Sequence, residues 1–423
     1  MNINPSQISS HNESLLADHK EKFDFLAQQL DKSGIDVENL IQKVQNLQIE
    51  VPSWALGTGG TRFGRFAGGG EPGNLIQKIE DVGVLNTLSR ACDSISLHIP
   101  WDIPSDANAI KQELKTKGLK INSVNSNTFQ DQPDQKHSYK FGSLCHTDKE
   151  VRKQAVDHNI EVIEYGKMLD ANVLTVWLAD GSSFPGQMDF RRAYSNTLSS
   201  LEEIYSKIPN EWQMLLEYKP FEPAFYHTVI PDWGTSYSMV TALGDKANTL
   251  VDLGHHLPNT NIEQIVATLQ LLNKLGGFHF NDSKYADDDI SVGSIKPYAL
   301  FLIFLELVKG ETTNMEPAWM IDASHNLKDP LQDLLQSLQN IHLNYAKALT
   351  VNLDELRHAQ ESNEVAQCQE ILQNAFQLDL RPLVAEARFR AGGALNPLSA
   401  FKSLKVRENL IKERGTSTVA TGL

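Results

Sequence analysis

Short apolar runs alternate with longer amphipathic segments from Val51 to about residue 330, and this alternation constrains the fold more than any other feature of the chain. Such a rhythm is typical of parallel strands joined by helical crossovers. Eight repeats, with no Gly-x-Gly-x-x-Gly turn after any run, favour a closed (β/α)8 TIM barrel over an open sheet. The strand candidates are Pro52–Leu56, Ile95–Pro100, Lys120–Val124, Val173–Leu178, Met214–Glu217, Thr249–Leu253, Gly277–Phe280 and Trp319–Ile321.

Helical patterns fill the segments between these runs and continue on both sides of them. Within the barrel, helix candidates are Ser105–Lys117 with Ser105 as a possible N-cap, Asp148–Leu169, Met188–Lys207, Asn261–Leu275 and Lys296–Lys309. Residues 12–47 predict two helices separated at 31–34, and helices are expected at 331–349, 351–376, 381–391 and 397–413. We therefore divide the chain into an N-terminal helical extension (1–48), a catalytic barrel (49–350) and a C-terminal helical extension (351–423).

Charge and composition exclude several classes of partner. The net charge is -15, from 38 basic and 53 acidic side chains, and no basic stretch could neutralise a phosphate backbone, so we expect no nucleic acid partner. No apolar run is long enough to cross a bilayer, and the first twenty residues lack the apolar stretch of a secretory signal. Cys92, Cys145 and Cys368 are widely spaced, which suits a reducing compartment. We expect a cytoplasmic protein without membrane partners.

Side chains able to bind a metal follow nearly every candidate strand. In a barrel of this type the active site forms at the carboxyl ends of the strands, so these groups should converge. Glu217 and Asp252 stand where a buried strand would carry apolar residues, and an uncompensated buried carboxylate is costly. A salt bridge from Glu217 to Lys219 is one remedy, whereas a shared cation would explain all the strand ends together. The expected ligands are Glu217, Asp252, His255, His279, Asp287, Asp289 and Asp322.

The segment 276–289 concentrates these candidates. Read alone, a histidine between two phenylalanines is more often a core residue, and three consecutive aspartates are usually a solvated loop. In an extended segment Asp287 and Asp289 would face one side and Asp288 the other. Seven ligands are too many for one ion, so we expect two divalent ions with Glu217 as the bridge. A carboxylate-rich set without thiolates favours Mn²⁺, Co²⁺ or Mg²⁺ over structural zinc.

Aromatic residues cluster near the same strand ends. Either they pack in the core, or they form the wall of a pocket for an apolar sugar face or a deoxy methyl group. The residues concerned are Trp54, Phe63, Phe66, Trp101 and Trp177.

Several segments together resemble bacterial L-rhamnose isomerases of the broad-specificity kind that also act on D-allose, within the wider group of xylose-isomerase-like barrels. The resemblance spans about residues 50–330 and rests on Trp54-Ala-Leu-Gly-Thr-Gly-Gly-Thr-Arg-Phe-Gly-Arg-Phe66, Leu97-His-Ile-Pro-Trp-Asp102, Leu216-Glu-Tyr-Lys-Pro220, Val251-Asp-Leu-Gly-His-His256, Phe278-His-Phe-Asn-Asp282, Asp287-Asp-Asp289 and Ile321-Asp-Ala-Ser-His325.

This resemblance implies a role for each candidate residue. Glu217, Asp252, His279 and Asp322 would form a structural metal site, and His255, Asp287 and Asp289, with Glu217 shared, a catalytic one. Lys219, His98 and Asp322 would act on the sugar oxygens, and Trp54, Phe63, Trp101 and Trp177 would line the pocket. It further implies two ions per subunit, with Mn²⁺ favoured, and a homotetramer in which Phe129 reaches a neighbour's pocket. The expected reaction is an aldose–ketose isomerisation by a metal-mediated 1,2-hydride shift.

Three other interpretations remain open from the residues. A single-metal sugar epimerase or dehydratase barrel would not need Asp287 and Asp289. A metal-dependent phosphodiesterase or endonuclease barrel could use similar ligands, although the negative charge of the chain opposes a polyanionic substrate. A non-catalytic helical scaffold would account for the C-terminal third alone.

Overall fold

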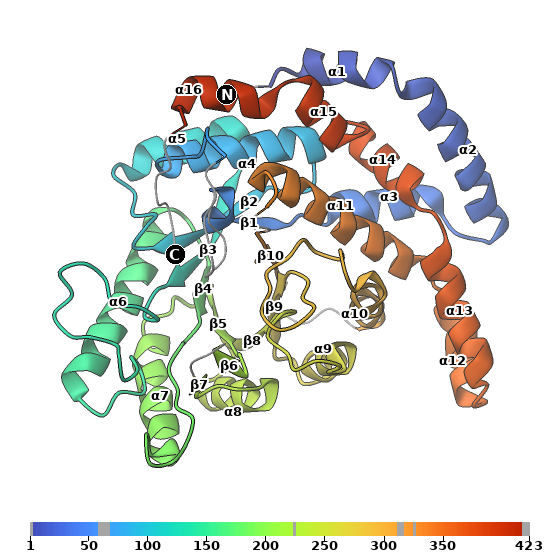
Figure 1. Ribbon diagram of the computed structural model, residues 1–423. Coiled ribbons are helices and arrows are strands. Elements are labelled where there is room, and N and C mark those ends of the chain that lie inside the picture. The colour runs from blue at the N-terminus through green and yellow to red at the C-terminus, as the bar shows by residue number, and fades with distance from the viewer. Residues whose placement is uncertain (1–2, 58–67, 223–225, 311–316, 325–326, 417–423) are drawn as a thin grey trace.

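Eight parallel strands close into a barrel in the computed structural model (Figure 1). The structure describes residues 3–57, 68–222, 226–310, 317–324 and 327–416. Around the barrel the order is β1-β10-β9-β8-β5-β4-β3-β2, which confirms the predicted (β/α)8 architecture. The strands are β1 (Glu50–Pro52), β2 (Ser94–Ile99), β3 (Lys120–Ser126), β4 (Val173–Val176), β5 (Gln213–Glu217), β8 (Ala247–Asp252), β9 (Leu275–Phe280) and β10 (Ala318–Ile321).

A helix follows each barrel strand, and together these helices surround the sheet (Figure 1). Most of these helices begin at an Asn or Asp whose side chain accepts a backbone N–H of the first turn. The predicted cap at Ser105 is wrong, because Asp106 accepts the N–H groups of Asn108 and Ala109. The helices are α4 (Leu75–Ser89), α5 (Ala107–Lys117), α6 (Lys149–Met168), α7 (Phe190–Tyr205), α8 (Trp233–Leu243), α9 (Ile262–Leu271), α10 (Pro297–Lys309) and α11 (Pro330–Leu349).

The first strand lies earlier than predicted. It ends at Pro52, and a 3-10 helix follows over Ser53–Leu56. The apolar run at Trp54 and Leu56 looked like a strand because both side chains are buried, but they pack as a helical turn at the end of β1. The expected strand Pro52–Leu56 is therefore wrong, although the barrel position that it was meant to fill is occupied by β1. A short hairpin, β6 (Phe221–Glu222) with β7 (Tyr226–His227), follows β5.

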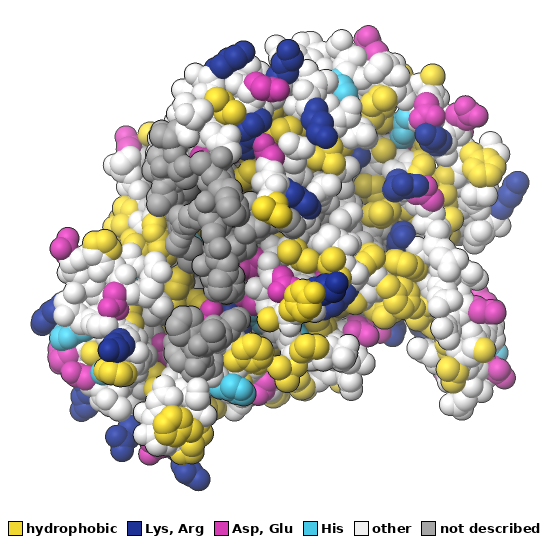
Figure 2. Space-filling model, viewed as in Figure 1, with side chains coloured by type: hydrophobic (Ala, Val, Ile, Leu, Met, Phe, Trp, Pro, Cys, Tyr) yellow, Lys and Arg dark blue, Asp and Glu magenta, His cyan; other side chains and the backbone are white. Residues whose placement is uncertain are grey.

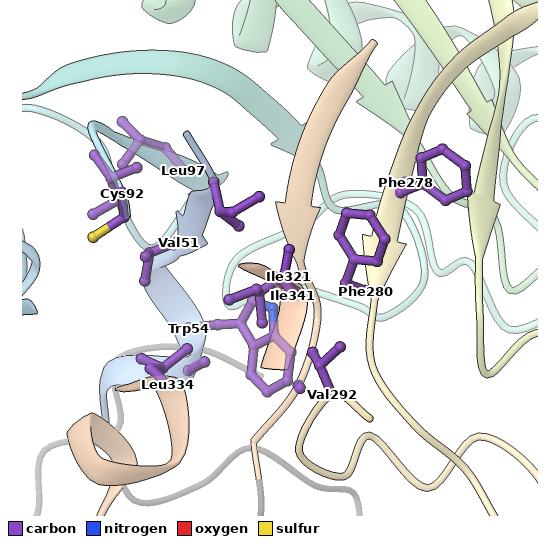
Figure 3. Close-up of a cluster of buried hydrophobic side chains, with 14 of the residues drawn as sticks. Val51, Trp54, Cys92, Leu97, Phe278, Phe280, Val292, Ile321, Leu334 and Ile341 are labelled. Carbon is purple, nitrogen blue, oxygen red and sulfur yellow. The ribbon is translucent and has the colours of Figure 1, made fainter. Parts of the chain in front are cut away.

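Strand β9 places apolar side chains on the outer face of the barrel and His279 on its inner face. The rings of Phe278 and Phe280 stack 5.1 Å apart, and Phe280 also stacks on Phe304 of α10 at 5.6 Å. Because side chains alternate along a strand, His279 between them faces the inside of the barrel. A Cβ at Gly277 would lie 2.6 Å from the carbonyl oxygen of Ala318 in β10, so only glycine allows this strand pairing. Figure 3 shows the outer core around β1, β9, β10 and α11, with Val51, Phe280, Ile321, Leu334 and Ile341.

The N-terminal extension contains three helices where two were predicted: α1 (Pro5–Glu13), α2 (Leu16–Lys32) and α3 (Val37–Asn46). Helix α1 begins at Asn4 in a reciprocal capping box with Gln7, a signal that the apolar periodicity did not reveal. The break near Gly34 lies where it was predicted. Apolar side chains of α2 and α3 pack against α11 and α14 in a second core.

The described part of the C-terminal extension, up to residue 416, contains five helices: α12 (Leu353–Glu361), α13 (Val365–Gln377), α14 (Arg381–Arg390), α15 (Pro397–Ser403) and α16 (Val406–Arg414). The continuous helices predicted over 351–376 and 397–413 are wrong, because Asn363 and Lys405 take left-handed backbone conformations that end a helix. Figure 1 shows α12 and α13 extending away from the barrel, while α15 and α16 return to the side that carries α4.

Basic and acidic side chains are interspersed on the face shown in Figure 2, without a continuous basic surface among the described residues of that face. Within the described part of the chain, none of the helices combines the length and apolar character needed to span a bilayer.

Candidate metal centre

The candidate ligands face the barrel interior because they continue the inward-facing row of each strand. A small apolar cluster from different strands fills the interior and includes Leu215, Leu250 and Met320. A residue two positions further along a strand faces the same way. Glu217, Asp252 and Asp322 each lie two positions beyond one of these residues, toward the carboxyl end, so the strand register itself brings them together.

Glu217, Asp252 and His279 form a first group, with donor atoms within 4.8 Å of one another. Nδ1 of His279 lies 3.1 Å from Glu217 Oε1 and 3.7 Å from Asp252 Oδ2. It also lies 3.9 Å from Asp322 Oδ2, and the indole N–H of Trp54 donates to Asp322 Oδ1 at 2.8 Å. The four residues predicted for one metal site therefore meet at one point.

Asp252, His255 and Asp287 form a second group, again within 4.8 Å. Nδ1 of His255 lies 3.0 Å from the backbone oxygen of Tyr218 and 3.2 Å from Glu217 Oε1. A proton donated from Nδ1 to this carbonyl leaves Nε2 as the acceptor atom, and Nε2 lies 3.4 Å from Asp287 Oδ1. The two groups share Asp252, whereas Glu217 Oε1 lies close to both imidazoles.

The three consecutive aspartates have separate roles. Asp288 accepts the backbone N–H groups of Lys284 and Tyr285 and so closes a turn, pointing away from the centre as predicted. The reason given for this was wrong, because Asp289 has φ +50 and the segment is not extended there. Asp289 lines the same cavity as Asp287, and burial together with repulsion from Asp287 holds the pKa of its carboxyl well above the usual range.

Lys219 does not neutralise Glu217. Its ammonium donates to Glu222 Oε2 and Asp287 Oδ2, both at 2.7 Å, and lies 5.3 Å from the centre of a Trp177 ring. The ionic partners of Glu217 among the described residues are the two imidazoles, His255 and His279. The simple salt bridge considered for Glu217 is thus replaced by a shared acidic and imidazole cluster.

The electrostatics of this cluster are those of buried like charges. Burial favours the neutral form of Glu217, but the charges of His279 and His255 outweigh it and lower its pKa to about 2. Burial opposes protonation of His279, yet Glu217 and Asp322 outweigh it and raise its pKa to about 9. Burial raises the pKa of Asp252 to about 7 despite the attraction of His255. At neutral pH protons therefore occupy His279 and part of Asp252, where a cation could bind, while Glu217 is ionised.

The residues fit a divalent cation. Oδ1 of Asp252 accepts the N–H of Gly254 at 2.7 Å and the side-chain amide of Asn281 at 2.9 Å. Its other oxygen, Oδ2, is buried and makes no hydrogen bond among the described residues, although it lies 3.7 Å from Nδ1 of His279. Buried carboxylate oxygens in this state are stabilised by a metal, and oxygen and imidazole donors suit Mn²⁺, Co²⁺ or Mg²⁺.

A cavity of about 90 Å³ lies beside the ligands, and aromatic side chains form part of its wall. Trp54, Phe129 and Trp177 line it, with Phe129 edge-on to Trp177 at 4.8 Å. Phe129 thus lines the cavity of its own chain, and its predicted contact with a neighbouring subunit stays a prediction. Trp101 packs behind it, 6.4 Å from the Phe129 ring, and Phe63 lies outside the described residues.

His98 lines the cavity from β2, as predicted. Burial lowers the pKa of its imidazole to about 4, so the ring is neutral at physiological pH. Its Nδ1 is buried without a hydrogen-bond partner among the described residues and is available to a bound molecule. Asp102 accepts the backbone N–H of His98 and the ammonium of Lys78, which anchors the end of β2.

Two other polar side chains near the strand ends, Asp282 and His256, bond to groups other than the candidate ligands, and two cavity residues were not predicted. Asp282 accepts backbone N–H groups of residues 295 and 296, and His256 contacts the Tyr218 hydroxyl at 2.6 Å. The unpredicted residues are Ser126 and Thr175, and Asn125 at the end of β3 lines the cavity with them. Thr175 is a short polar residue on β4 itself, and its inward orientation could have been read from strand alternation.

The comparison with known proteins agrees with this geometry. Residues 90–314 match the family model described as xylose isomerase-like TIM barrel. A probable sugar isomerase of Rhizobium meliloti is 48% identical over 97% of this chain and 96% of its own length. A second, from Mesorhizobium japonicum, is 45% identical over 99% of this chain and 98% of its own length. An L-ribulose 3-epimerase structure is similar in fold, with a TM-score of 0.53 and 13% identity over 71% of this chain and 95% of that one. The chain therefore belongs to the xylose isomerase-like TIM barrel family.

Proposed function

We propose that this protein is a metal-dependent aldose–ketose isomerase that interconverts L-rhamnose and L-rhamnulose and also accepts sugars of the D-allose and D-psicose type. The observation that carries the proposal is the pair of overlapping ligand groups, joined at Asp252, beside a partly aromatic cavity at the carboxyl ends of the barrel strands. The name probable sugar isomerase, given to two relatives along nearly their whole length, supports the reaction class.

Two divalent ions, with Mn²⁺ favoured, would be held by this centre. Glu217, Asp252, His279 and Asp322 would hold one ion; His255, Asp287 and Asp289 would hold the other, next to the shared carboxylates. When bound, such ions polarise the carbonyl and hydroxyl oxygens of an open-chain sugar. The absence of cysteine from the ligand set supports an ion that prefers oxygen and imidazole donors.

The side chains around the ligands bind and orient the sugar. Neutral His98, with Asp322, hydrogen-bonds the anomeric oxygen and moves its proton as the ring opens. Lys219, fixed by Asp287 and Glu222, supplies positive charge on that side of the cavity and stabilises negative charge on the carbonyl oxygen.

The aromatic wall sets the environment of the reacting carbons. Trp54, Phe129 and Trp177 exclude water and contact the deoxy methyl group of the sugar. Because the carboxylates in the cavity are all committed as ligands, none is left to act as a base on carbon. A hydride therefore passes directly from C2 to C1, while the O2 hydroxyl loses a proton and O1 gains one.

An aldose panel with a metal count tests this proposal. The protein loaded with Mn²⁺ is assayed on L-rhamnose, L-mannose, L-lyxose and D-allose, and the bound metal is measured by atomic emission. We expect two ions per chain, ketose formation from L-rhamnose, and loss of activity in Glu217→Gln and Asp289→Asn. One ion per chain with epimerised ketoses would support a single-metal epimerase, and cleavage of phosphodiesters would support the nuclease alternative.

The proposed assembly is a homotetramer located in the cytoplasm. Cys92 and Cys145 are buried free thiols and Cys368 is a partly buried one, a state that persists under reducing conditions. Light scattering coupled to gel filtration would show four chains per particle, and a monomer or dimer would contradict the proposal.

A further inference from the structure

Arg407 of helix α16 joins two loops at the mouth of the barrel. Its Nε and Nη2 donate to the two oxygens of Asp329 at 2.6 and 3.0 Å. Its Nη1 donates to the backbone oxygens of Gly69 and Gly70, both at 3.2 Å. Asp329 lies in the loop after β10, and the two glycines precede α4 in the connection after β1. Because β1 and β10 are neighbours at the barrel closure, one guanidinium holds both connections.

The glycine turn is built against α16. Gly70 has φ +70, and a Cβ there would lie 2.7 Å from the backbone nitrogen of Ile411. Its own N–H donates to the oxygen of Gly415 at 2.8 Å. The turn at Gly69 and Gly70 therefore packs against α16 in one arrangement only, and Arg407 fixes the position of α16 relative to Asp329.

From Asp329 the contacts continue toward the candidate ligands. The neighbouring Lys328 bonds the hydroxyl of Ser291 and lies 3.0 Å from Asp333 Oδ1. Ser291 follows the ligand loop by two residues, and the carbonyl of Asp289 in that loop accepts the N–H of Ser324 at 2.8 Å. The loop after β10 is thus tied to the loop that carries two proposed ligands of the second ion.

We propose that Arg407 is a positioning residue for the metal centre, acting through Asp329 on the loops after β9 and β10. The inference rests on the proposed function in that it assigns the loops a role in metal and sugar binding. A bidentate arginine–carboxylate pair that is mostly buried has a defined geometry, so it can hold a loop where a single flexible contact would not. The C-terminal extension then completes the centre without contributing a ligand.

A helix that merely stabilises the barrel would depend equally on its other buried arginine. Arg414 pairs with Asp81 and Glu80 of α4 at 2.8 and 3.0 Å, and it reaches Gly70 only at 3.4 Å. Arg414→Met therefore loosens α16 from α4 but leaves the pair with Asp329 intact. It is the matched control for Arg407→Met.

Four variants test the inference: Arg407→Met, Asp329→Asn, the double variant and Arg414→Met. Asparagine at 329 retains the oxygen that caps α11, but it loses the charge and replaces the oxygen that accepts from Arg407 Nε by an amide donor. Mn²⁺ affinity is measured by calorimetry without sugar, thermal stability in EDTA, and kcat and KM on the best aldose. We expect about tenfold weaker Mn²⁺ binding in the first three variants, with the double variant no worse than Arg407→Met. Arg414→Met should lower the melting temperature while retaining wild-type Mn²⁺ affinity and KM.

Two results would overturn the inference. One is wild-type Mn²⁺ affinity and KM in Arg407→Met, and the other is an equal loss of affinity in Arg414→Met. If Arg407→Met does not fold, Asp329→Asn decides by the same measurements. A wild-type protein that is inactive on every aldose would count against the proposed function. The calorimetry would still test whether Arg407 positions the metal ligands.

Discussion

Replacing Asp252 by asparagine should move stability in opposite directions with and without metal. Asp252 belongs to both ligand groups, is fully buried, and accepts N–H groups from Gly254 and Asn281 on one oxygen only. Asparagine can keep that accepting oxygen, and its amide nitrogen then takes the place of Oδ2. The variant preserves the shape of the site but removes the negative charge and the lone pairs that a metal requires.

The size of the metal-free effect follows from the pKa of Asp252. Burial raises this pKa to about 7, above its value of about 3.9 in an unfolded chain. The contribution to stability is complete below pH 4 and is lost as pH rises to 7, by roughly 4 kcal/mol in all. For 423 residues this corresponds to roughly 4 to 5 °C in melting temperature. Asparagine cannot ionise, so metal-free Asp252→Asn should be the more stable protein, with an advantage that grows from about pH 4 to about pH 7 and is complete by about pH 8.

Bound Mn²⁺ should make the wild type more stable than Asp252→Asn and so reverse the order of stability of the two proteins. At a free Mn²⁺ concentration of about 100 times Kd, each occupied site stabilises the wild type by about 2.7 kcal/mol. Asp252→Asn lacks the ligand common to both groups, so the same Mn²⁺ concentration should add almost nothing to its stability.

Calorimetric melting in EDTA and in MnCl₂, across this pH range, measures both effects. Asp288→Asn is the control, because Asp288 closes a backbone turn and should leave the response to metal unchanged. A metal-free Asp252→Asn that melts below the wild type at pH 8, or one that Mn²⁺ stabilises as strongly, would refute the reasoning.

Three further predictions concern the neighbours of the centre, the reaction and the fold. Trp54→Phe keeps the ring but removes the N–H that holds Asp322, so Mn²⁺ should bind about tenfold more weakly by calorimetry; unchanged affinity would show that this contact does not position the ligand. Turnover of L-rhamnose in deuterated water should leave C1 of the ketose free of deuterium by NMR, and stoichiometric labelling at C1 would replace the hydride shift with proton transfer. Burial lowers the pKa of His342 to about 4, below its unfolded value, so its contribution to stability is present above pH 6.5 and is lost as pH falls through 4, by about 3 kcal/mol. His342→Gln can still donate to the carbonyl of Leu47 and should show a correspondingly smaller loss in urea unfolding at acid pH; an unchanged loss would place the acid sensitivity elsewhere.

The barrel and most of its centre could be predicted because both depend on local sequence periodicity. Apolar runs located seven of the eight strands closely. A polar residue at the carboxyl end of a barrel strand lies at the face of the barrel where the active site forms. Glu217, Asp252 and Asp322 meet for this reason alone, since each continues the inward row of its own strand. Knowledge of the partner strands was not required.

What could not be predicted depends on contacts between distant segments. The apolar side chains of Trp54 and Leu56 are as consistent with a buried turn as with a strand, and the turn is decided by packing at the end of β1. Asp289 has a left-handed backbone that no alternation pattern implies. The partners of Lys219 are 3 and 68 positions away in the chain, and the nearer, Glu222, was not considered.

The stability of the candidate metal centre depends both on the strand register, which could be predicted, and on the distant contacts, which could not. Strand register places carboxylates and imidazoles within a few ångströms of one another, an arrangement that is costly unless protons or cations fill it. In the metal-free protein, raised pKa values at Asp252 and His279 keep protons there, and a divalent ion must displace them to bind. We propose that contacts from outside the barrel strands, among them Trp54 to Asp322 and Arg407 to Asp329, keep the ligands in place during that exchange. On this proposal the helices added to the barrel keep a set of mutually repelling ligands in an arrangement that protons stabilise without metal and that a cation stabilises when bound.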